Sequence, residues 1–165
     1  MLETLNEQRV NYLLIGGMNF LIRHAPERTF DLDVWVADEP ANLEALNRAL
    51  RQLGAAWGPT EAAWGPIPDD WRWLRRQPCF CLTTAHGALD VFLEVLGLEG
   101  RFAACRAAGI PTITASGVRF IGLNDQDMLR CQEALPPTQR KAHRMEVLRA
   151  ALQRVAPASD SSRAS

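Results

Sequence analysis

Two short stretches decide the fold of this chain: YLLIGG at residues 12–17 and RTFDLDVWV at residues 28–36. The second stretch is an apolar run of strand-forming residues that carries two acids, Asp31 and Asp33. Side chains alternate between the two faces of a strand, so residues two apart point the same way. We therefore predict that both carboxylates project from one face, while the opposite face packs in the core through Leu32 and Val34.

Two neighbouring carboxylates repel each other, and each raises the pKa of the other unless a cation lies between them. Mg²⁺ prefers oxygen ligands and usually keeps positions free for substrate phosphates. A second apolar run, residues 89–95, supplies a third acid, Asp90. Two ions held roughly 3.5–4 Å apart by carboxylates promote displacement at phosphorus. We predict that Asp31, Asp33 and Asp90 are catalytic and hold two Mg²⁺ ions, with Mn²⁺ as the alternative metal.

The glycine pair, Gly16 and Gly17, ends the first apolar run. Glycine lets the backbone approach a phosphate closely, and the N–H groups of a following helix start point at the anion. We predict that both glycines contact a phosphorylated substrate. Arg28 either neutralises the acids or binds phosphate, and Thr29 either contacts the substrate or packs locally; the sequence leaves both pairs of alternatives open.

In this order, the Gly-Gly pair, the Asp-Leu-Asp motif and a later strand aspartate resemble the nucleotidyltransferase superfamily, which includes DNA polymerase β. The RTFDLD form at residues 28–33 is most similar to small bacterial stand-alone members of the abortive-infection toxin type. The resemblance covers residues 8–95 well and the C-terminal third loosely. It implies an α/β (α+β) fold, in which a mixed β-sheet is flanked by helices and the polymerase β-like core is followed by C-terminal helices.

The resemblance also implies an activity: transfer of a nucleoside monophosphate from a nucleoside triphosphate such as ATP to an acceptor hydroxyl, with release of pyrophosphate. The acceptor is left open as an RNA end, a protein or a small molecule such as an aminoglycoside. A toxin role, with an antitoxin as partner, and a homodimer are further expectations. The residues implied to bind the nucleotide are Gly16, Gly17, Arg28, Thr29 and Lys141.

The C-terminal third departs from these relatives, which carry a lysine late in the domain and a Lys-Asp pair. Gln132 stands where the lysine is expected, and Arg140 and Lys141 are the substitutes available as phosphate ligands. The departures leave a second hypothesis, a non-catalytic nucleotide-binding protein that kept the fold. A third hypothesis is a structural protein that dimerises through the tryptophan-rich stretch, residues 55–78.

Composition indicates a soluble globular protein, with 47% hydrophobic and 22% charged residues in a chain of 165. This length predicts a single domain over residues 1–155, and the small, polar composition of residues 156–165 predicts a disordered tail. The net charge of −1 argues against an electrostatically driven nucleic-acid binder. No secretory signal or membrane-spanning run is found, so we expect a cytoplasmic protein without membrane contacts.

A basic strip in residues 130–154 is either a phosphate-facing surface or a solvated helix face. The four cysteines show no zinc-ligand spacing, and we expect buried thiols. In residues 55–78 the motif AAWGP occurs twice, and its tryptophans either stack a ligand or cap the edge of the core.

Hydrophobic periodicity and turn residues predict the remaining elements. Strands are expected at 10–15, 31–36, 79–84, 89–95, 112–114 and 118–121. Helices are expected at 2–9, 18–24, 42–53, 101–108, 125–135 and 138–155.

Overall fold

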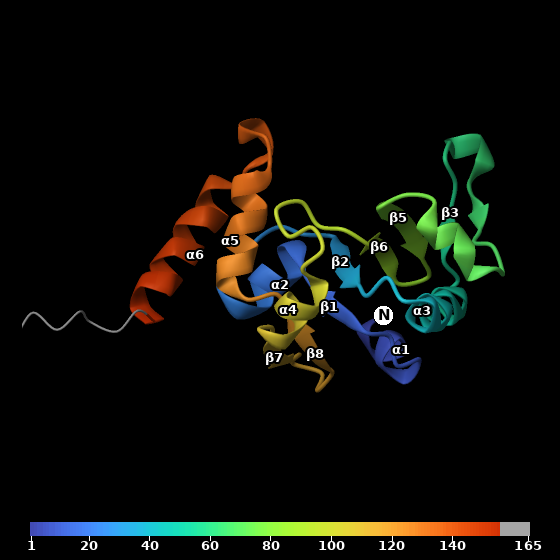
Figure 1. Ribbon diagram of the computed structural model, residues 1–165, viewed down its shortest axis with the longest axis horizontal. Coiled ribbons are helices and arrows are strands. Elements are labelled where there is room, and N and C mark those ends of the chain that lie inside the picture. The colour runs from blue at the N-terminus through green and yellow to red at the C-terminus, as the bar shows by residue number, and fades with distance from the viewer. Residues whose placement is uncertain (156–165) are drawn as a thin grey trace, which may run out of the picture.

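A computed structural model describes residues 1–155, and the tail predicted to be disordered, residues 156–165, lies outside the described residues. An eight-stranded mixed sheet runs through the molecule in the order β4-β3-β5-β6-β2-β1-β8-β7 (Figure 1). Its strands are β1 (Tyr12–Leu14), β2 (Asp31–Val36), β3 (Ala56–Trp57), β4 (Gly65–Pro66), β5 (Cys79–Thr84), β6 (Gly87–Phe92), β7 (Ile110–Ile113) and β8 (Arg119–Gly122).

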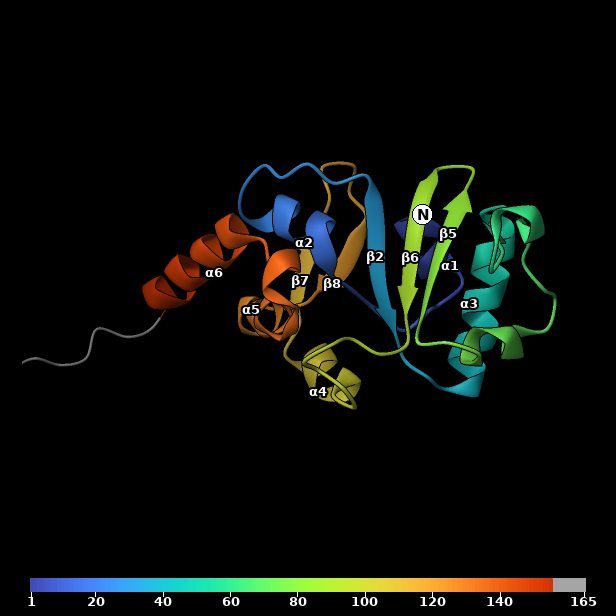
Figure 2. The same ribbon diagram turned by 90° about the horizontal axis from the view of Figure 1, so that it is seen from above.

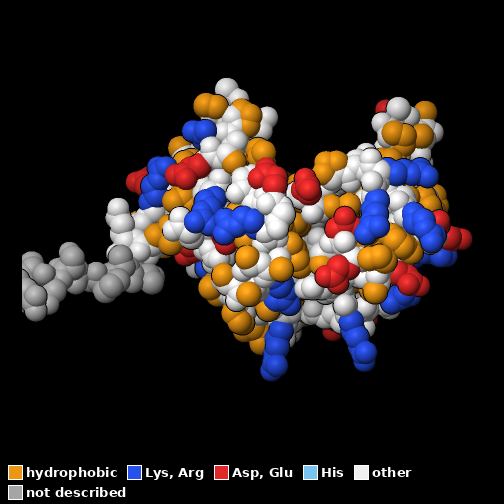
Figure 3. Space-filling view, viewed as in Figure 1, with side chains coloured by type: hydrophobic (Ala, Val, Ile, Leu, Met, Phe, Trp, Pro, Cys, Tyr) orange, Lys and Arg blue, Asp and Glu red, His pale blue; other side chains and the backbone are white. Residues whose placement is uncertain are grey.

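Helices lie on both faces of this sheet, which confirms the mixed sheet flanked by helices (Figure 2). The helices are α1 (Leu2–Glu7), α2 (Gly16–Arg23), α3 (Pro40–Gln52), α4 (Phe102–Ala107), α5 (Asp125–Ala134) and α6 (Ala142–Val155). Three short 3₁₀ turns connect the other elements: η1 (Glu61–Ala63), η2 (Trp71–Arg75) and η3 (Pro137–Gln139). The surface is hollowed between two projections, the α5–α6 connection and the β3–β4 hairpin (Figure 3).

Each face of the sheet has its own hydrophobic core. On one face, Leu32 and Val34 of β2 pack with α1 and α3, as strand alternation predicts. On the other face, Trp35 of β2 packs in a second cluster with α2, α4, α5 and α6. That second cluster covers only part of its face, because the acids of β2 and β6 take the neighbouring positions. The site therefore lies beside a well-packed core and on rigid strands.

Several boundaries differ from the expected ones for local reasons. α2 begins at Gly16 rather than at Met18, because Gly16 adopts a left-handed φ of 64° that turns the chain directly from β1 into the helix. The helix expected over residues 138–155 is divided into η3 and α6, since Pro137 starts a separate turn. β6 begins at Gly87 and ends at Phe92, so residues 93–95 lie outside the strand.

The tryptophan-rich stretch folds into ordered structure at the sheet edge. The two AAWGP copies pair as an antiparallel hairpin, in which Trp57 lies opposite Gly65. Trp73 is buried and contacts the rings of Trp57 and Phe80, with centroids 5.8 and 4.6 Å apart. Trp64 remains 42% exposed. This packing supports the core-edge interpretation for Trp57 and Trp73.

In the part of the chain that the structure describes, no helix combines the length and apolarity needed to cross a membrane.

Candidate active site

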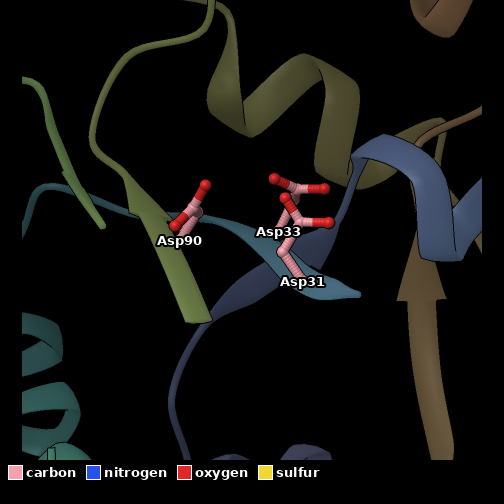
Figure 4. A group of neighbouring side chains, drawn as sticks. All are labelled: Asp31, Asp33 and Asp90. Carbon is pink, nitrogen blue, oxygen red and sulfur yellow. The ribbon is translucent and has the colours of Figure 1, made fainter. Parts of the chain in front are cut away.

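Three carboxylates meet on the open face of the sheet, two from β2 and one from its neighbour β6 (Figure 4). β2 and β6 are parallel, and their register sets Asp33 directly opposite Asp90. Asp31 precedes Asp33 by two residues and points to the same face. One oxygen from each of the three lies within 4.8 Å of the others, which is a set of donors that fits a divalent cation.

The charges in this cluster are poorly matched by the protein itself. Burial, together with the nearby charges of Asp31 and Asp90, raises the pKa of Asp33 to about 6. Burial also raises the pKa of Asp90 above its usual range, and Asp31 adds to that increase. A bound cation would offset the repulsion between the acids, which adds to the effect of burial on both pKa values.

The acidic cluster makes the metal-free protein less stable as pH rises. A carboxyl with a raised folded pKa binds its proton more tightly in the folded state, so stability is present near pH 4 and is lost as pH rises through about 6. In chelator, we expect the free energy of unfolding of Asp33→Asn, relative to that of wild type, to increase by up to about 3 kcal/mol between pH 4 and pH 8. Urea denaturation across this range measures it, and a pH-independent difference would contradict the origin in Asp33.

The glycine pair lies against the acids at the start of α2. The backbone N–H of Ile15 donates to the carbonyl of Asp33 at 3.0 Å, and the backbone of Gly17 lowers the pKa of the Asp33 carboxyl against the larger effect of burial. A Cβ on Gly16 would overlap the same carboxylate, and one on Gly17 would lie 2.6 Å from the Thr29 hydroxyl. Both positions therefore require glycine for close packing against the carboxylate cluster.

Thr29 and Arg28 differ in their placement. The Thr29 hydroxyl donates to Asp31 at 2.9 Å, so it orients one of the three carboxylates. The Arg28 side chain is exposed, and within residues 1–155 it has neither a hydrogen bond nor an ion pair. The structure therefore brings Thr29 to the cluster and leaves Arg28 in solvent.

A cation from another element, Arg144 of α6, lies beside Gly17. Arg144 is 6% exposed, and its charge lowers the pKa of Asp33 against the larger effects of burial and the neighbouring acids. Its guanidinium is paired with both carboxylate oxygens of Glu27, with Nε 3.0 Å from Oε2. Lys141 pairs with the same carboxylate at 2.6 Å but is half exposed. Arg144 of α6 and Lys141, the residue before α6, therefore converge on the α2–β2 connection.

Sequence reasoning named Lys141 but not Arg144 or Glu27 as site residues. Arg144 belonged to the basic strip, for which both a phosphate-facing surface and a solvated face remained open. Only the folded structure shows which cations of the basic strip lie at the site, because most of the strip's other cations have partners away from Asp31, Asp33 and Asp90. Arg130 pairs with Asp127, Arg149 with Glu133, and Arg140 with backbone carbonyls.

A cavity of about 320 Å³ opens beside Asp33. Its walls are mostly apolar and come from β6, the segment after β6 and α5, including Phe92, Val95 and Met128. Gly16 and Arg144 also line it, so the cavity connects the glycine pair with the C-terminal helices.

The four cysteines are free thiols. Cys105 is buried as expected, but Cys81 is exposed, because it lies opposite Asp90 on the part of the sheet that the helices leave uncovered. Burial raises the pKa of Cys79 and of Cys131 to about 12, so both are protonated at neutral pH.

A scan against models of protein families finds no match for this chain, and a search of curated proteins finds none. Solved structures do match. The lincosamide antibiotic adenylyltransferase LnuA, with lincomycin bound, aligns at a TM-score of 0.51 and 12% identity, covering 90% of this chain and 92% of LnuA. The antibiotic-resistance factor ANT(2'')-Ia aligns in its solution structure at 0.51 and 12% identity, covering 93% and 79% of the two chains.

A complex of ANT(2'')-Ia with adenylyl-2''-tobramycin aligns at a TM-score of 0.50 and 15% identity, covering 93% of this chain and 84% of that one. The chain thus has the fold of antibiotic adenylyltransferases, and the nucleotidyltransferase fold that the sequence resemblance implies is confirmed.

Proposed function

We propose that this chain, which has the fold of the adenylyltransferases described above, transfers a nucleoside monophosphate from a nucleoside triphosphate to an acceptor hydroxyl. The observation that carries the proposal is the group of three carboxylates within 4.8 Å, set against the glycine pair at the start of α2. Carboxylate oxygens suit Mg²⁺, and a helix start with close-packed glycines suits a phosphate chain.

Asp31, Asp33 and Asp90 hold the metal ions in this proposal, and Thr29 keeps Asp31 in position through its hydrogen bond. When bound, Mg²⁺ would neutralise the three carboxylates and stabilise negative charge on the transferred phosphoryl group. Gly16 and Gly17 let the α2 start approach the triphosphate, and Arg144 supplies a fixed positive charge beside it.

The reaction exchanges one phosphorus–oxygen bond for another. The acceptor oxygen forms a bond to the α-phosphorus, the bond from that phosphorus to the bridging oxygen breaks, and pyrophosphate leaves with the electron pair. Asp90 takes the proton of the acceptor hydroxyl, since it lies across the cluster from the glycine pair. Alignment and charge stabilisation supply most of the rate enhancement in such transfers.

A small hydroxylated molecule is the acceptor we favour. LnuA binds lincomycin, and ANT(2'')-Ia binds an adenylylated tobramycin. The net charge of −1 is a poor match for a polyanionic acceptor such as an RNA end.

The test is a screen of the four nucleoside triphosphates with Mg²⁺ against a panel of hydroxylated antibiotics, with pyrophosphate release as the readout. Release that depends on Mg²⁺, on one triphosphate and on one acceptor supports the proposal. A triphosphate that raises the melting temperature but never releases pyrophosphate would support the non-catalytic nucleotide-binding protein instead.

Arg144 provides a sharper test of the phosphate-binding surface. Arg144→Met is expected to lower pyrophosphate release about 100-fold, because a buried cation next to the triphosphate is lost. Arg149→Met is the matched control, since it lies on the same helix and loses an exposed ion pair with Glu133. Equal activity of the two variants would remove Arg144 from the site.

A further inference from the structure

The proposed metal site gives no role to the cavity beside Asp33, although Asp33 forms part of its wall. It is lined mainly by apolar side chains, with Phe92, Met128 and Leu135 among them. Its volume of about 320 Å³ falls at the lower end of the range for small-molecule sites, which are typically apolar with a few placed polar groups. Such walls suit a flat aromatic ring better than a sugar.

One polar side chain in this wall, Gln132, has hydrogen-bond donors without a protein partner within the range that the structure describes. Gln132 of α5 is 6% exposed, and its Oε1 accepts a hydrogen bond from the backbone N–H of Lys141 at 2.9 Å. Within residues 1–155, no acceptor is found for the N–H groups of its Nε2, while the residue lines the cavity. An amide carries two donors, and those of Gln132 Nε2 keep contact with solvent, because Asn19 Oδ1 is the one fully buried side-chain polar atom without a partner in the described residues. The wall is therefore arranged to meet a hydrogen-bond acceptor.

We propose that this cavity receives the nucleobase of the donor nucleotide and that Gln132 selects the base by donating a hydrogen bond to it. The inference rests on the proposed function and adds to it the place and the selection of the base. A base offers an aromatic ring to the apolar walls and ring-nitrogen or carbonyl acceptors to the amide.

The position of the cavity favours the donor over the acceptor molecule. Gly16, Asp33 and Arg144 line it, whereas Asp90 is not among its lining residues in the described part of the chain. In an in-line displacement, the attacking hydroxyl and the leaving pyrophosphate lie on opposite sides of the phosphorus. A molecule in the cavity therefore lies on the side of the donor nucleotide, next to Gly16 and Arg144. It lies away from Asp90, which takes the proton of the acceptor hydroxyl.

The experiment separates the base from the phosphates. We would titrate wild type with each of the four nucleoside triphosphates and with tripolyphosphate, all with Mg²⁺ and without acceptor, by calorimetry. One triphosphate is expected to bind at least about tenfold more tightly than tripolyphosphate, because the base adds aromatic contacts and one hydrogen bond.

Gln132→Glu is the informative variant, because it keeps an oxygen for the Lys141 N–H and replaces the free donors by an acceptor. It is expected to lose about tenfold in affinity for the preferred triphosphate and to leave tripolyphosphate binding unchanged. Gln139→Glu adds the same charge at an exposed position of η3 and is expected to behave as wild type.

A second variant does not disturb the buried amide. Leu96 lines the cavity but is 51% exposed, so Leu96→Trp narrows the cavity without overpacking the core. It is expected to weaken triphosphate binding and to leave tripolyphosphate binding unchanged.

Three results overturn the inference. Equal binding of triphosphates and tripolyphosphate to wild type places the base outside the cavity. If Gln132→Glu loses the same affinity for every triphosphate and for tripolyphosphate, Gln132 has a purely structural role. If both variants bind the triphosphates as tightly as wild type does, the nucleobase does not bind in the cavity. If tripolyphosphate still binds in these cases, the proposed function stands without the inference. If wild type binds none of these ligands, the proposed function is overturned as well.

Discussion

Asp33→Asn is expected to lower Mg²⁺-dependent pyrophosphate release by at least about 10³-fold, the largest effect of any single substitution in this chain. Asp33 lies opposite Asp90 in the β2–β6 register, packs closely against Gly16 and contributes to the three-carboxylate group. Replacing its charged oxygen by an amide nitrogen removes a metal ligand from the centre of the group.

The same substitution is expected to separate stability from activity. In chelator at pH 8, Asp33→Asn unfolds at higher denaturant concentration than wild type, because a carboxylate that is buried and repelled by its neighbours is gone. Addition of Mg²⁺ stabilises wild type and leaves the variant unchanged. Asp38→Asn is the control, since this acid follows the same strand but pairs with Arg75 at the surface. A variant that keeps wild-type turnover would exclude Asp33 from catalysis.

Gly16→Ala is expected to lower activity strongly, because the added Cβ disturbs the geometry of the site while leaving its charges unchanged. Gly16 has a φ of 64°, which costs other residues about 1–2 kcal/mol, and an added Cβ would overlap the Asp33 carboxylate. The carboxylate or the start of α2 must move, and a misplacement of about 1 Å at a reacting centre costs about 100-fold in rate. We expect a total loss of stability of about 3 kcal/mol and a fall of at least about 100-fold in pyrophosphate release.

Gly54→Ala isolates the backbone contribution. Gly54 has nearly the same φ, 63°, but a Cβ there has no atom within 4 Å. This variant is expected to lose about 1 kcal/mol of stability and no activity. If Gly16→Ala and Gly54→Ala are equally stable and equally active, the close packing of Gly16 on Asp33 has no functional consequence.

The strand that carries the first two acids was predictable from the chain itself. Residues 31–36 form β2 as expected, Leu32 and Val34 are buried, and the two acids share the other face. Alternation along a strand is a local property of the backbone and needs no knowledge of neighbouring elements. The expected hairpin of residues 79–84 and 89–95 also forms, although its second strand runs from Gly87 to Phe92.

Boundaries next to the site were less predictable. The helix after β1 was expected from Met18 but begins at Gly16, because the left-handed conformation of one glycine turns the chain at once. Glycine is rare inside helices, so sequence patterns favour a later start. The consequence is functional, since the earlier start puts Gly16 and Gly17 against Asp33 and Thr29.

By itself, the sequence determined the types of element, the common face of Asp31 and Asp33, and the acidic and glycine residues that resemble a nucleotidyltransferase. Tertiary structure alone decided which distant residues join them. The parallel pairing of β2 with β6 sets Asp90 opposite Asp33, and the packing of α5 and α6 turns Gln132 to the cavity and Arg144 to the glycines. Helical spacing shows which residues share a helix face, but the rotation of that helix against the sheet depends on contacts between segments far apart in the chain.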